Sequence, residues 1–356
     1  MTVRLFAGPL RYLQGPGALD ELGELLAPYG PSPAVVTDAV VLELLGDRLE
    51  QILRGAGLTP EVRLLPGEIT AAAADELTSS LRPGRPGIVV GIGGGKAIDA
   101  GKAVSLRLGV PVVTVPTIAS NDSPTSRAVA MYDHQHRMAS VDQLPVNPHA
   151  VVVDTGVVVT APVRFLRAGI GDAIAKTFEA AGCAAGTGVT TLGTRPLRVG
   201  AVIADAAHDV LRSHAVAGVA ACERQELTAD VEAVVEAVVL LSGMGFENGG
   251  LSLAHSLTRG LMRARGAKDA LHGEHVAWAS LVQLAAEHRD VSELRGFLVS
   301  VGLPVDLPGL GLPDATLNEV REIARATMSA PHLANLAVPV TEGDVVAAIL
   351  EVEGRA

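Results

Sequence analysis

The strongest constraint on the fold is a regular alternation of short β-rich runs and helical patterns in the first third of the chain. Strands are expected at residues 34–37, 62–65, 87–91 and 110–114, with helices at 40–53, 71–81 and 96–106 between them. Strands that alternate with helices of about 10–15 residues form βαβ units, whose strands run parallel. The pattern therefore predicts a parallel sheet, to which residues 151–154 add a further strand.

The β signal ends near residue 160. Before that point, residues 127–132 and 136–141 predict a hairpin around a polar turn. Beyond it, long Ala-, Leu- and Val-rich segments follow a 3.6-residue period at 170–184, 197–211, 230–245, 251–263, 272–287 and 318–327. We therefore expect an α/β domain at residues 1–160 and an all-α domain at 161–356, which suits a chain of 356 residues.

Charge and hydropathy exclude several classes of partner. The chain has 28 Lys and Arg against 39 Asp and Glu, with no basic block, so neither nucleic acid nor an anionic membrane is an expected partner. Mean hydropathy is +0.35, yet the apolar runs are too short to cross a bilayer. With no apolar signal segment near the N-terminus and only Cys183 and Cys222, we expect a cytoplasmic protein with reduced thiols.

A glycine-rich turn follows the third expected strand and opens a helix. It contains Gly93, Gly94, Gly95 and Lys96, and Asp99 comes one turn later. Glycines let the backbone approach a phosphate group, and a helix N-terminus offers free N–H groups and a positive dipole end. The spacing matches neither the GxGxxG fingerprint nor a Walker A loop. The motif predicts a phosphate-binding turn, and the alternative is a βα turn without a ligand.

Two further features lie where strands are expected to end. Asp38 follows the first strand, where a carboxylate accepts hydrogen bonds from an adenosine ribose and repels a 2′-phosphate. A surface aspartate opening a loop fits Asp38 equally well. The polar loop at 116–126 brings hydroxyls and the carboxylate of Asp122 to the carboxyl edge of the sheet, where α/β proteins bind ligands. An ordinary turn-rich loop has the same composition.

One aspartate and two histidines in the second half of the chain suit a catalytic zinc ion. Asp172, His255 and His272 would leave the fourth position open, as catalytic zinc sites do. Their wide spacing matches no compact metal motif, and Asp172 alone also suits the N-cap of a helix. His272 and His275 form a weaker i, i+3 pair.

In this order, the motifs resemble those of the glycerol dehydrogenase family, within the superfamily of iron-containing alcohol dehydrogenases and dehydroquinate synthase. The resemblance spans nearly the whole chain and rests on residues 93–102, 116–126, 171–173, 245–255, 271–274, 300–304 and 338–341. It implies a dehydroquinate synthase-like fold, with a nucleotide-binding α/β domain and an all-α metal-binding domain. It also implies an NAD- and zinc-dependent oxidoreductase that interconverts a small polyol and its ketone, assembled as a homo-oligomer and commonly an octamer.

The resemblance implies roles for individual residues. Asp172, His255 and His272 would be the zinc ligands, Asp122 would contact the substrate hydroxyl, and Asp38 would face the adenosine. The pyrophosphate and nicotinamide would be held by Gly95, Lys96, Thr117, Ser120, Ser126 and Tyr132, with Gly93, Gly94 and Asp99 in the same glycine motif.

Lys176 departs from the family pattern. Iron-dependent relatives carry a histidine ligand four residues after the aspartate, so lysine at this position favours zinc. Glycerol dehydrogenases have a small neutral residue there, whereas similar hydroxycarboxylate dehydrogenases carry lysine. Because lysine is rare among the 28 basic residues, we predict a catalytic role in which Lys176 meets a substrate with a carboxylate, a phosphate or a dense hydroxyl array. The alternative is that Lys176 only pairs with Asp172 or Glu179.

Other functions remain open at this point. A hydroxycarboxylate, phosphorylated polyol or cyclic polyol dehydrogenase would have the same fold. A dehydroquinate synthase-type lyase should show more basic residues for a phosphate-bearing substrate, and a non-catalytic nucleotide-binding protein needs no metal ligands. His275 is a second departure, because the family usually has lysine there.

Overall fold

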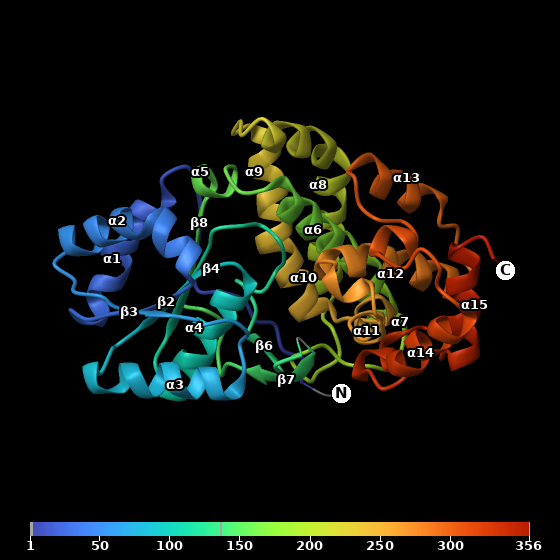
Figure 1. The fold of residues 1–356 in the computed structure, drawn as a ribbon, viewed down its shortest axis with the longest axis horizontal. Helices are drawn as coiled ribbons and strands as arrows, with labels where there is room; N and C mark the ends of the chain where they lie inside the picture. The colour runs from blue at the N-terminus through green and yellow to red at the C-terminus, as the bar shows by residue number, and fades with distance from the viewer. Residues whose placement is uncertain (1–2, 136, 356) are drawn as a thin grey trace. The chain divides into compact units, whose positions relative to one another are not determined.

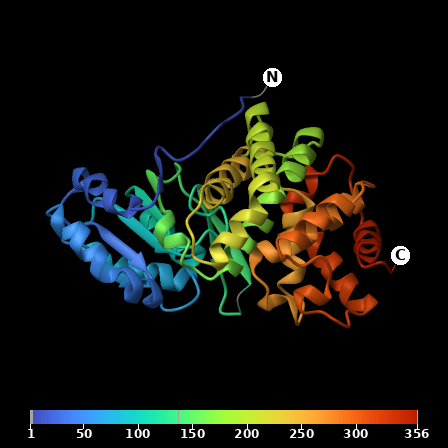
Figure 2. The ribbon, with the colours of Figure 1, turned by 90° about the horizontal axis from the view of Figure 1, so that it is seen from above.

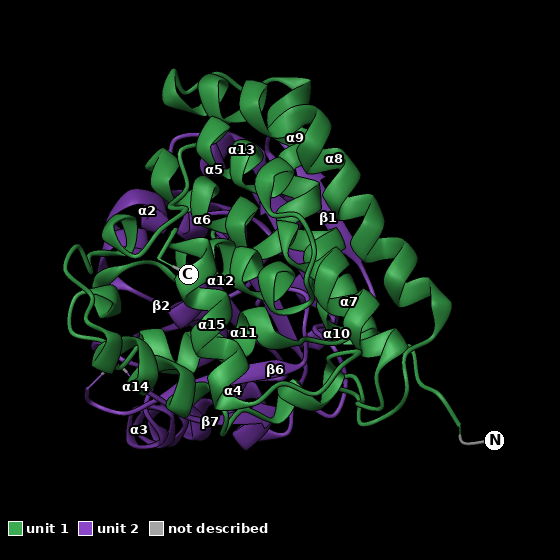
Figure 3. Ribbon diagram, turned by 90° about the vertical axis from the view of Figure 1, so that its right-hand side faces the viewer, with its two compact units in different colours: residues 1–7, 120–122, 162–356 green, residues 8–119, 123–161 purple. Residues whose placement is uncertain are grey.

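The structure is a computed structural model that describes residues 3–135 and 137–355. It divides into two compact units (Figure 3). One consists of Gly8–Ala119 and Ser123–Ala161, and the other of Pro162–Ala356 together with Met1–Ala7 and Ser120–Asp122. The chain thus enters the second unit after Ala161, and two short segments from the N-terminal half are grouped with it.

A six-stranded parallel sheet forms the centre of the first unit, which confirms the predicted α/β fold. Its order is β1-β8-β5-β4-β2-β3. The strands are β1 (Tyr12–Gly15), β2 (Ala34–Thr37), β3 (Glu61–Leu64), β4 (Val89–Gly93), β5 (Val112–Pro116) and β8 (Ala150–Asp154). β1 was not expected from the sequence. Its residues are only half-buried, so they lack the continuous apolar run that marks β2 or β8.

Helices cover both faces of this sheet (Figure 1). α1 (Leu22–Leu26) and α2 (Ala39–Gly55) pack on one face, α3 (Ala71–Leu81) and α4 (Gly95–Leu108) on the other, and α5 (Thr155–Val158) follows β8. Within β4, Val89 joins the α3–α4 core and Val90 the α1–α2 core, as alternation along a strand requires. A Cβ on Gly101 would lie 2.5 Å from the Cα of Gly91, so α4 approaches β4 closely because both residues are glycine.

The predicted hairpin is also present. β6 (Ala128–Tyr132) pairs antiparallel with β7 (Met138–Gln143), with an irregularity between Met131 and Tyr132. His136, which the sequence places at the start of the second arm, lies outside the described residues.

The second unit is helical in the part of the chain that the structure describes, as expected. Its main helices are α6 (Val163–Ile174), α7 (Lys176–Ala185), α8 (Arg198–Glu223), α9 (Ala229–Glu236), α10 (Ser242–Gly249), α11 (Leu253–Leu261), α12 (His272–Ala286), α13 (Ser292–Ser300), α14 (Leu317–Thr327) and α15 (Glu342–Val352). α12 is central: its residues from His275 to Ala285 are buried, and it packs against α6, α11 and α15 (Figure 2).

Two interruptions in these helices matter for the site. Ala175 separates α6 from α7, although its backbone stays in the helical region. A π-helical turn at Ala237–Leu241 connects α9 to α10 and widens the helix just before Ser242. The two cysteines, Cys183 and Cys222, are buried free thiols. Within residues 3–135 and 137–355, no helix has both the length and the apolar character that crossing a membrane requires.

Candidate active site

The residues expected to bind a nucleotide gather where β2, β4 and β5 end. These strands are neighbours in the sheet, so their carboxyl ends share one edge. The N–H of Thr117, after β5, donates to the carbonyl of Gly93 over 3.1 Å. A Cβ on Gly93, where φ is +139°, would lie 3.1 Å from Asp38 Oδ2. The structure therefore brings Asp38, Gly93 and Thr117 together at this edge.

The first turn of α4 starts at the same edge. Gly94 occupies the N-cap in an extended conformation and has no side chain to satisfy the N–H groups of Gly95 and Lys96. The ammonium of Lys96 forms an ion pair with Glu68. The carboxylate of Asp38 accepts the N–H of Val41 over 2.9 Å and so caps α2. An uncapped helix N-terminus is suited to binding an anionic phosphate.

A buried ion pair orders the loop after Asp122. Asp99 accepts the hydroxyl of Ser123 over 2.7 Å and the N–H of Ala130 over 3.3 Å. Lys102, 3.0 Å from Asp99, donates to the carbonyls of Ser123 (2.8 Å) and Ser126 (3.3 Å). Asp99, predicted to bind the cofactor, thus also holds the loop that carries Ser126. The sequence did not single out Lys102 for this role, since a lysine on a helix is normally exposed.

The other two predicted cofactor residues lie in different units. Tyr132 ends β6, where its N–H donates to the carbonyl of Ile69 over 2.9 Å. Burial, together with the charges of Asp99 and Glu68, raises the pKa of its phenol well above the ordinary value. Ser120 is grouped with the helical unit, and its hydroxyl accepts the side-chain N–H of Asn121 over 3.3 Å.

The three predicted metal ligands converge within the helical unit. Asp172 lies in the last turn of α6, His255 in the first turn of α11, and His272 begins α12. Asp172 Oδ1 is 3.2 Å from His255 Nε2 and 3.9 Å from His272 Nε2. One ligand atom of each residue lies within 4.8 Å of the others. Because Asp172 ends a helix, the interpretation of this residue as an N-cap is wrong.

Glu179 fixes the orientation of His255. Its side chain is fully buried and accepts three hydrogen bonds: Ser252 N–H (2.8 Å) and His255 N–H (3.1 Å) at Oε1, and His255 Nδ1–H (2.7 Å) at Oε2. Burial alone would lower the pKa of His255, but the charge of Glu179 raises it to about 9. A cation binding at Nε2 would therefore release a proton. A carboxylate behind the distal nitrogen is the usual support of a metal-binding histidine.

The sequence analysis considered Glu179 only as a partner of Lys176. A signal was present, because Glu179 follows Asp172 by seven residues and Lys176 by three, so the three residues share one helical face. The spacing does not indicate where His255 lies, because His255 is in a different helix, α11.

Lys176 lies at the centre of the cluster, with its side chain 1% exposed. Its Nζ is 2.6 Å from Asp172 Oδ1, 3.1 Å from Asp122 Oδ2 and 3.2 Å from His255 Nε2. The pairing with Asp172 considered from the sequence is present, and the second partner is Asp122. Although burial opposes ionisation, the ammonium holds the pKa of Asp172 well below its usual range.

Asp122 belongs to Ser120–Asp122, the short segment of the polar loop that groups with the helical unit. Its Oδ2 also accepts the hydroxyl of Ser242 over 2.9 Å. Burial and the nearby charge of Asp172 raise the pKa of Asp122 despite the opposing charge of Lys176. Phe246 covers the cluster, with its ring centre 5.7 Å from Lys176 Nζ. The sequence analysis did not identify Ser242 or Phe246.

The composition of the cluster fits a divalent cation. The carboxylates of Asp122, Asp172 and Glu179 are buried beside the ammonium of Lys176 and the imidazole of His255. Buried charges are stable only when they are compensated. One carboxylate and two imidazoles are the ligands of many catalytic metal sites, and a dication would replace the proton that His255 holds at its raised pKa and keep the buried carboxylates compensated.

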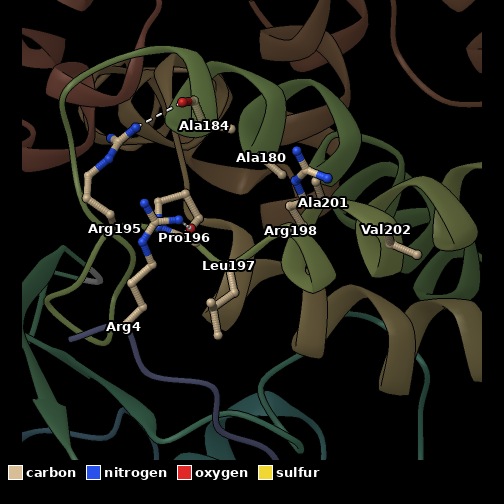
Figure 4. A pocket seen from close by; sticks show the side chains of 9 residues that line it. All are labelled: Arg4, Ala180, Ala184, Arg195, Pro196, Leu197, Arg198, Ala201 and Val202. Carbon is tan, nitrogen blue, oxygen red and sulfur yellow. Dashed lines mark hydrogen bonds between the residues drawn. The ribbon is translucent and has the colours of Figure 1, made fainter. Parts of the chain in front are cut away.

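Two other features lie apart from this cluster. His275 is buried and donates from Nε2 to the carbonyl of Ala267 over 2.6 Å, which holds the segment before α12. A pocket of about 450 Å³ in the helical unit contains none of the predicted site residues; it is lined by Arg4, Ala180, Ala184, Arg195, Pro196, Leu197, Arg198, Ala201 and Val202 (Figure 4). Arg195 there donates to main-chain carbonyls, including that of Ala184 over 2.9 Å, so it orders the chain before α8.

Comparisons with known proteins show which family the chain resembles over its whole length. A family profile described as iron-containing alcohol dehydrogenase matches residues 9–155. Glycerol dehydrogenase of Escherichia coli is 35% identical over 351 residues, covering 98% of this chain and 96% of the relative. Glycolaldehyde reductase of Halobacterium salinarum is 36% identical, covering 90% and 89%. The crystal structure of a probable glycerol dehydrogenase from Sinorhizobium meliloti 1021 superimposes with a TM-score of 0.93 at 35% identity, covering 99% of both chains.

Proposed function

Because the chain belongs to the glycerol dehydrogenase family of the iron-containing alcohol dehydrogenases, and is therefore a polyol dehydrogenase, we propose that its cofactors are NAD and zinc. The proposed reaction interconverts a small compound bearing adjacent oxygens, of the glycerol type, and the corresponding ketone. The observation that carries the proposal is the convergence of Asp172, His255 and His272 on one point, with Glu179 behind His255. The substrates named for two relatives, glycerol and glycolaldehyde, both have oxygens on adjacent carbons.

In this proposal, Asp172 Oδ1, His255 Nε2 and His272 Nε2 hold the zinc ion. When bound, zinc supplies a Lewis acid that lowers the pKa of the substrate hydroxyl, and NAD supplies the hydride acceptor. Glu179 keeps Nδ1 of His255 protonated, so the lone pair of Nε2 is directed toward the cation. Phe246 would place an aromatic face beside the ammonium of Lys176, whose Nζ lies 5.7 Å from the ring centre.

Asp122 is the residue that we propose to contact the substrate hydroxyl. Ser242 and Lys176 fix its Oδ2, so the carboxylate has one orientation. Its raised pKa makes it a stronger proton acceptor than an ordinary aspartate. A bound water or a cofactor hydroxyl remains an alternative route for this proton.

For the nucleotide, we propose that the first turn of α4 binds the pyrophosphate through the N–H groups of Gly95 and Lys96. Asp38, beside Gly93, would accept hydrogen bonds from the adenosine ribose. Thr117, Ser120, Ser126 and Tyr132 stay predicted contacts of the nicotinamide half, and a homo-oligomer stays the predicted assembly.

The ion pairs of Lys176 favour a neutral polyol over an anionic substrate. Two buried carboxylates already neutralise its ammonium, at 2.6 Å and 3.1 Å. A hydroxy acid would have to displace one of them, whereas glycerol requires no additional positive charge. The hydroxycarboxylate alternative therefore ranks second.

The test combines metal analysis with a substrate screen. The purified enzyme should contain about one zinc ion per chain and should reduce NAD with glycerol and other vicinal diols. Removing the metal with a chelator should abolish turnover, and adding zinc should restore it. Full activity in protein with no detectable metal would refute the zinc site, and turnover of hydroxy acids alone would refute the substrate class.

A further inference from the structure

We propose that Lys176 is an exchangeable counter-ion of the cation site: its ammonium competes with a divalent cation for Asp172 and pairs with Asp122 alone when that cation binds. This inference rests on the proposed function, because it concerns the same Asp172, His255 and His272. It assigns Lys176 a role in metal affinity rather than in substrate recognition.

The ammonium of Lys176 lies within hydrogen-bond distance of two atoms proposed to bind the cation. Lys176 Nζ is 2.6 Å from Asp172 Oδ1 and 3.2 Å from His255 Nε2. These are the oxygen and nitrogen that approach each other most closely among the three ligand residues, at 3.2 Å. Ammonium and metal ion therefore compete for the same carboxylate oxygen.

It is unfavourable for an ammonium and a metal ion to interact with Asp172 Oδ1 at the same time. A protonated lysine has three donors and no lone pair, so it is not a ligand, and it repels a dication nearby. A catalytic zinc ion needs its bond to the carboxylate oxygen at about 2.0–2.2 Å. Because Lys176 Nζ already lies beside both proposed ligand atoms, at 2.6 Å and 3.2 Å, we expect repulsion by a zinc ion bound there to displace the hydrogen bond between Lys176 and Asp172.

Asp122 provides the alternative partner. Its Oδ2 is already 3.1 Å from Lys176 Nζ and is held in place by Ser242. The ammonium thus needs only a small movement, and it stays paired after it leaves Asp172. No buried charge is left without a partner in either state, which avoids the large cost of an isolated buried ion.

The decisive measurement is the affinity for Zn²⁺ in the wild type and in Lys176→Met, by competition with a calibrated chelator. Methionine has a similar length without charge, so the competitor for Asp172 is removed. A hydrogen bond to a charged group corresponds to about 10- to 150-fold in affinity, and we expect Lys176→Met to bind Zn²⁺ more tightly by a factor in that range. The zinc-induced rise in unfolding temperature should be larger for the variant as well.

Lys102→Met is the matched control, because Lys102 is also a fully buried lysine paired with an aspartate, Asp99, at 3.0 Å. It should lower stability without changing the affinity for Zn²⁺. Equal or weaker zinc binding by Lys176→Met, with normal binding by the wild type, would overturn the inference and leave the proposed function intact. Absence of zinc binding in every variant would overturn both.

A crystal structure of the zinc-loaded wild type keeps the test independent of whether Lys176→Met folds. It should show Lys176 Nζ still bonded to Asp122 and more than about 4 Å from Asp172 Oδ1, beyond ion-pair range. If Lys176→Met folds only with zinc, its zinc affinity includes the cost of folding, and the position of Lys176 in the zinc-loaded wild type decides the inference instead. Lys176 Nζ found unchanged on Asp172 beside the metal, or coordinating it, would overturn the inference.

Discussion

Replacing Glu179 by glutamine should disable His255 as a ligand without removing any of its atoms. In the wild type, Oε1 of Glu179 accepts the N–H groups of Ser252 (2.8 Å) and His255 (3.1 Å), and Oε2 accepts Nδ1–H of His255 (2.7 Å). Glutamine has one acceptor oxygen and one donor NH₂. If the oxygen keeps the two backbone N–H groups, the NH₂ must face Nδ1.

Nδ1 then has to accept a hydrogen bond, so the proton of the neutral imidazole moves to Nε2. A protonated Nε2 cannot bind a metal ion. The opposite amide orientation would preserve the tautomer, but it would direct the NH₂ at two buried N–H groups. Either way, the affinity for Zn²⁺ should fall by at least 10- to 100-fold, the usual effect of losing such a partner, or about 1.4–2.7 kcal/mol.

Chelator competition measures the affinity, and long-range ¹H–¹⁵N correlations on histidine-labelled protein report which ring nitrogen of His255 carries the proton. Glu353→Gln is the control, because Glu353 likewise accepts Trp278 Nε1–H (3.0 Å) and Leu307 N–H (3.1 Å). It should leave the zinc affinity unchanged. Unchanged zinc affinity in Glu179→Gln, with Nδ1 still protonated, would refute the orienting role of Glu179.

Three further outcomes are expected. His255→Ala and His272→Ala should each lose zinc and turnover. NADH fluorescence should still report nucleotide binding, since most predicted nucleotide contacts lie in the α/β unit. Full zinc content in either variant would contradict the ligand assignment. The wild-type kcat/KM should be higher with NAD than with NADP, because Asp38 opposes a 2′-phosphate. Asp38→Ala should reduce this preference and lower the free energy of unfolding by about 1 kcal/mol through the lost cap of α2. A wild-type preference for NADP would disprove this role of Asp38. Gly101→Ala should lower the free energy of unfolding by roughly 1–3 kcal/mol in guanidinium denaturation, because its Cβ would meet Gly91 at 2.5 Å; an unchanged midpoint would show that α4 adjusts freely.

Local sequence signals were enough for most of the fold. The β2 residues Ala34–Thr37 are all buried, and α3 begins after the capping residue Thr70, as their patterns predict. The helices α13 and α15 were not anticipated, although Thr341 and Asp344 form a capping box at the start of α15. Both helices are short, with 9 and 11 residues, so an apolar period has little length in which to show.

For the site, the sequence predicted some residues and missed the contacts between them. Glycine spacing and strand ends predicted the edge at which we propose that the nucleotide binds, whereas the proposed metal ligands depended on resemblance because their separation in the chain is set by helix packing. The contact between Lys176 and Asp122 was not predictable, since Ser120–Asp122 comes from the polar loop but groups with the helices. No local pattern contains that information.

The π-helical turn at Ala237–Leu241 decides which downstream side chains face the site. The turn holds one extra residue per hydrogen-bonded loop, and Ser242 and Phe246 follow it. If the same residues formed an ordinary α-helix, everything downstream would rotate by about 100° relative to α9. Ser242 would leave Asp122, and Phe246 would leave Lys176. Relatives that share this cluster should therefore either keep the wide turn or have an ordinary α-helix that is one residue shorter there.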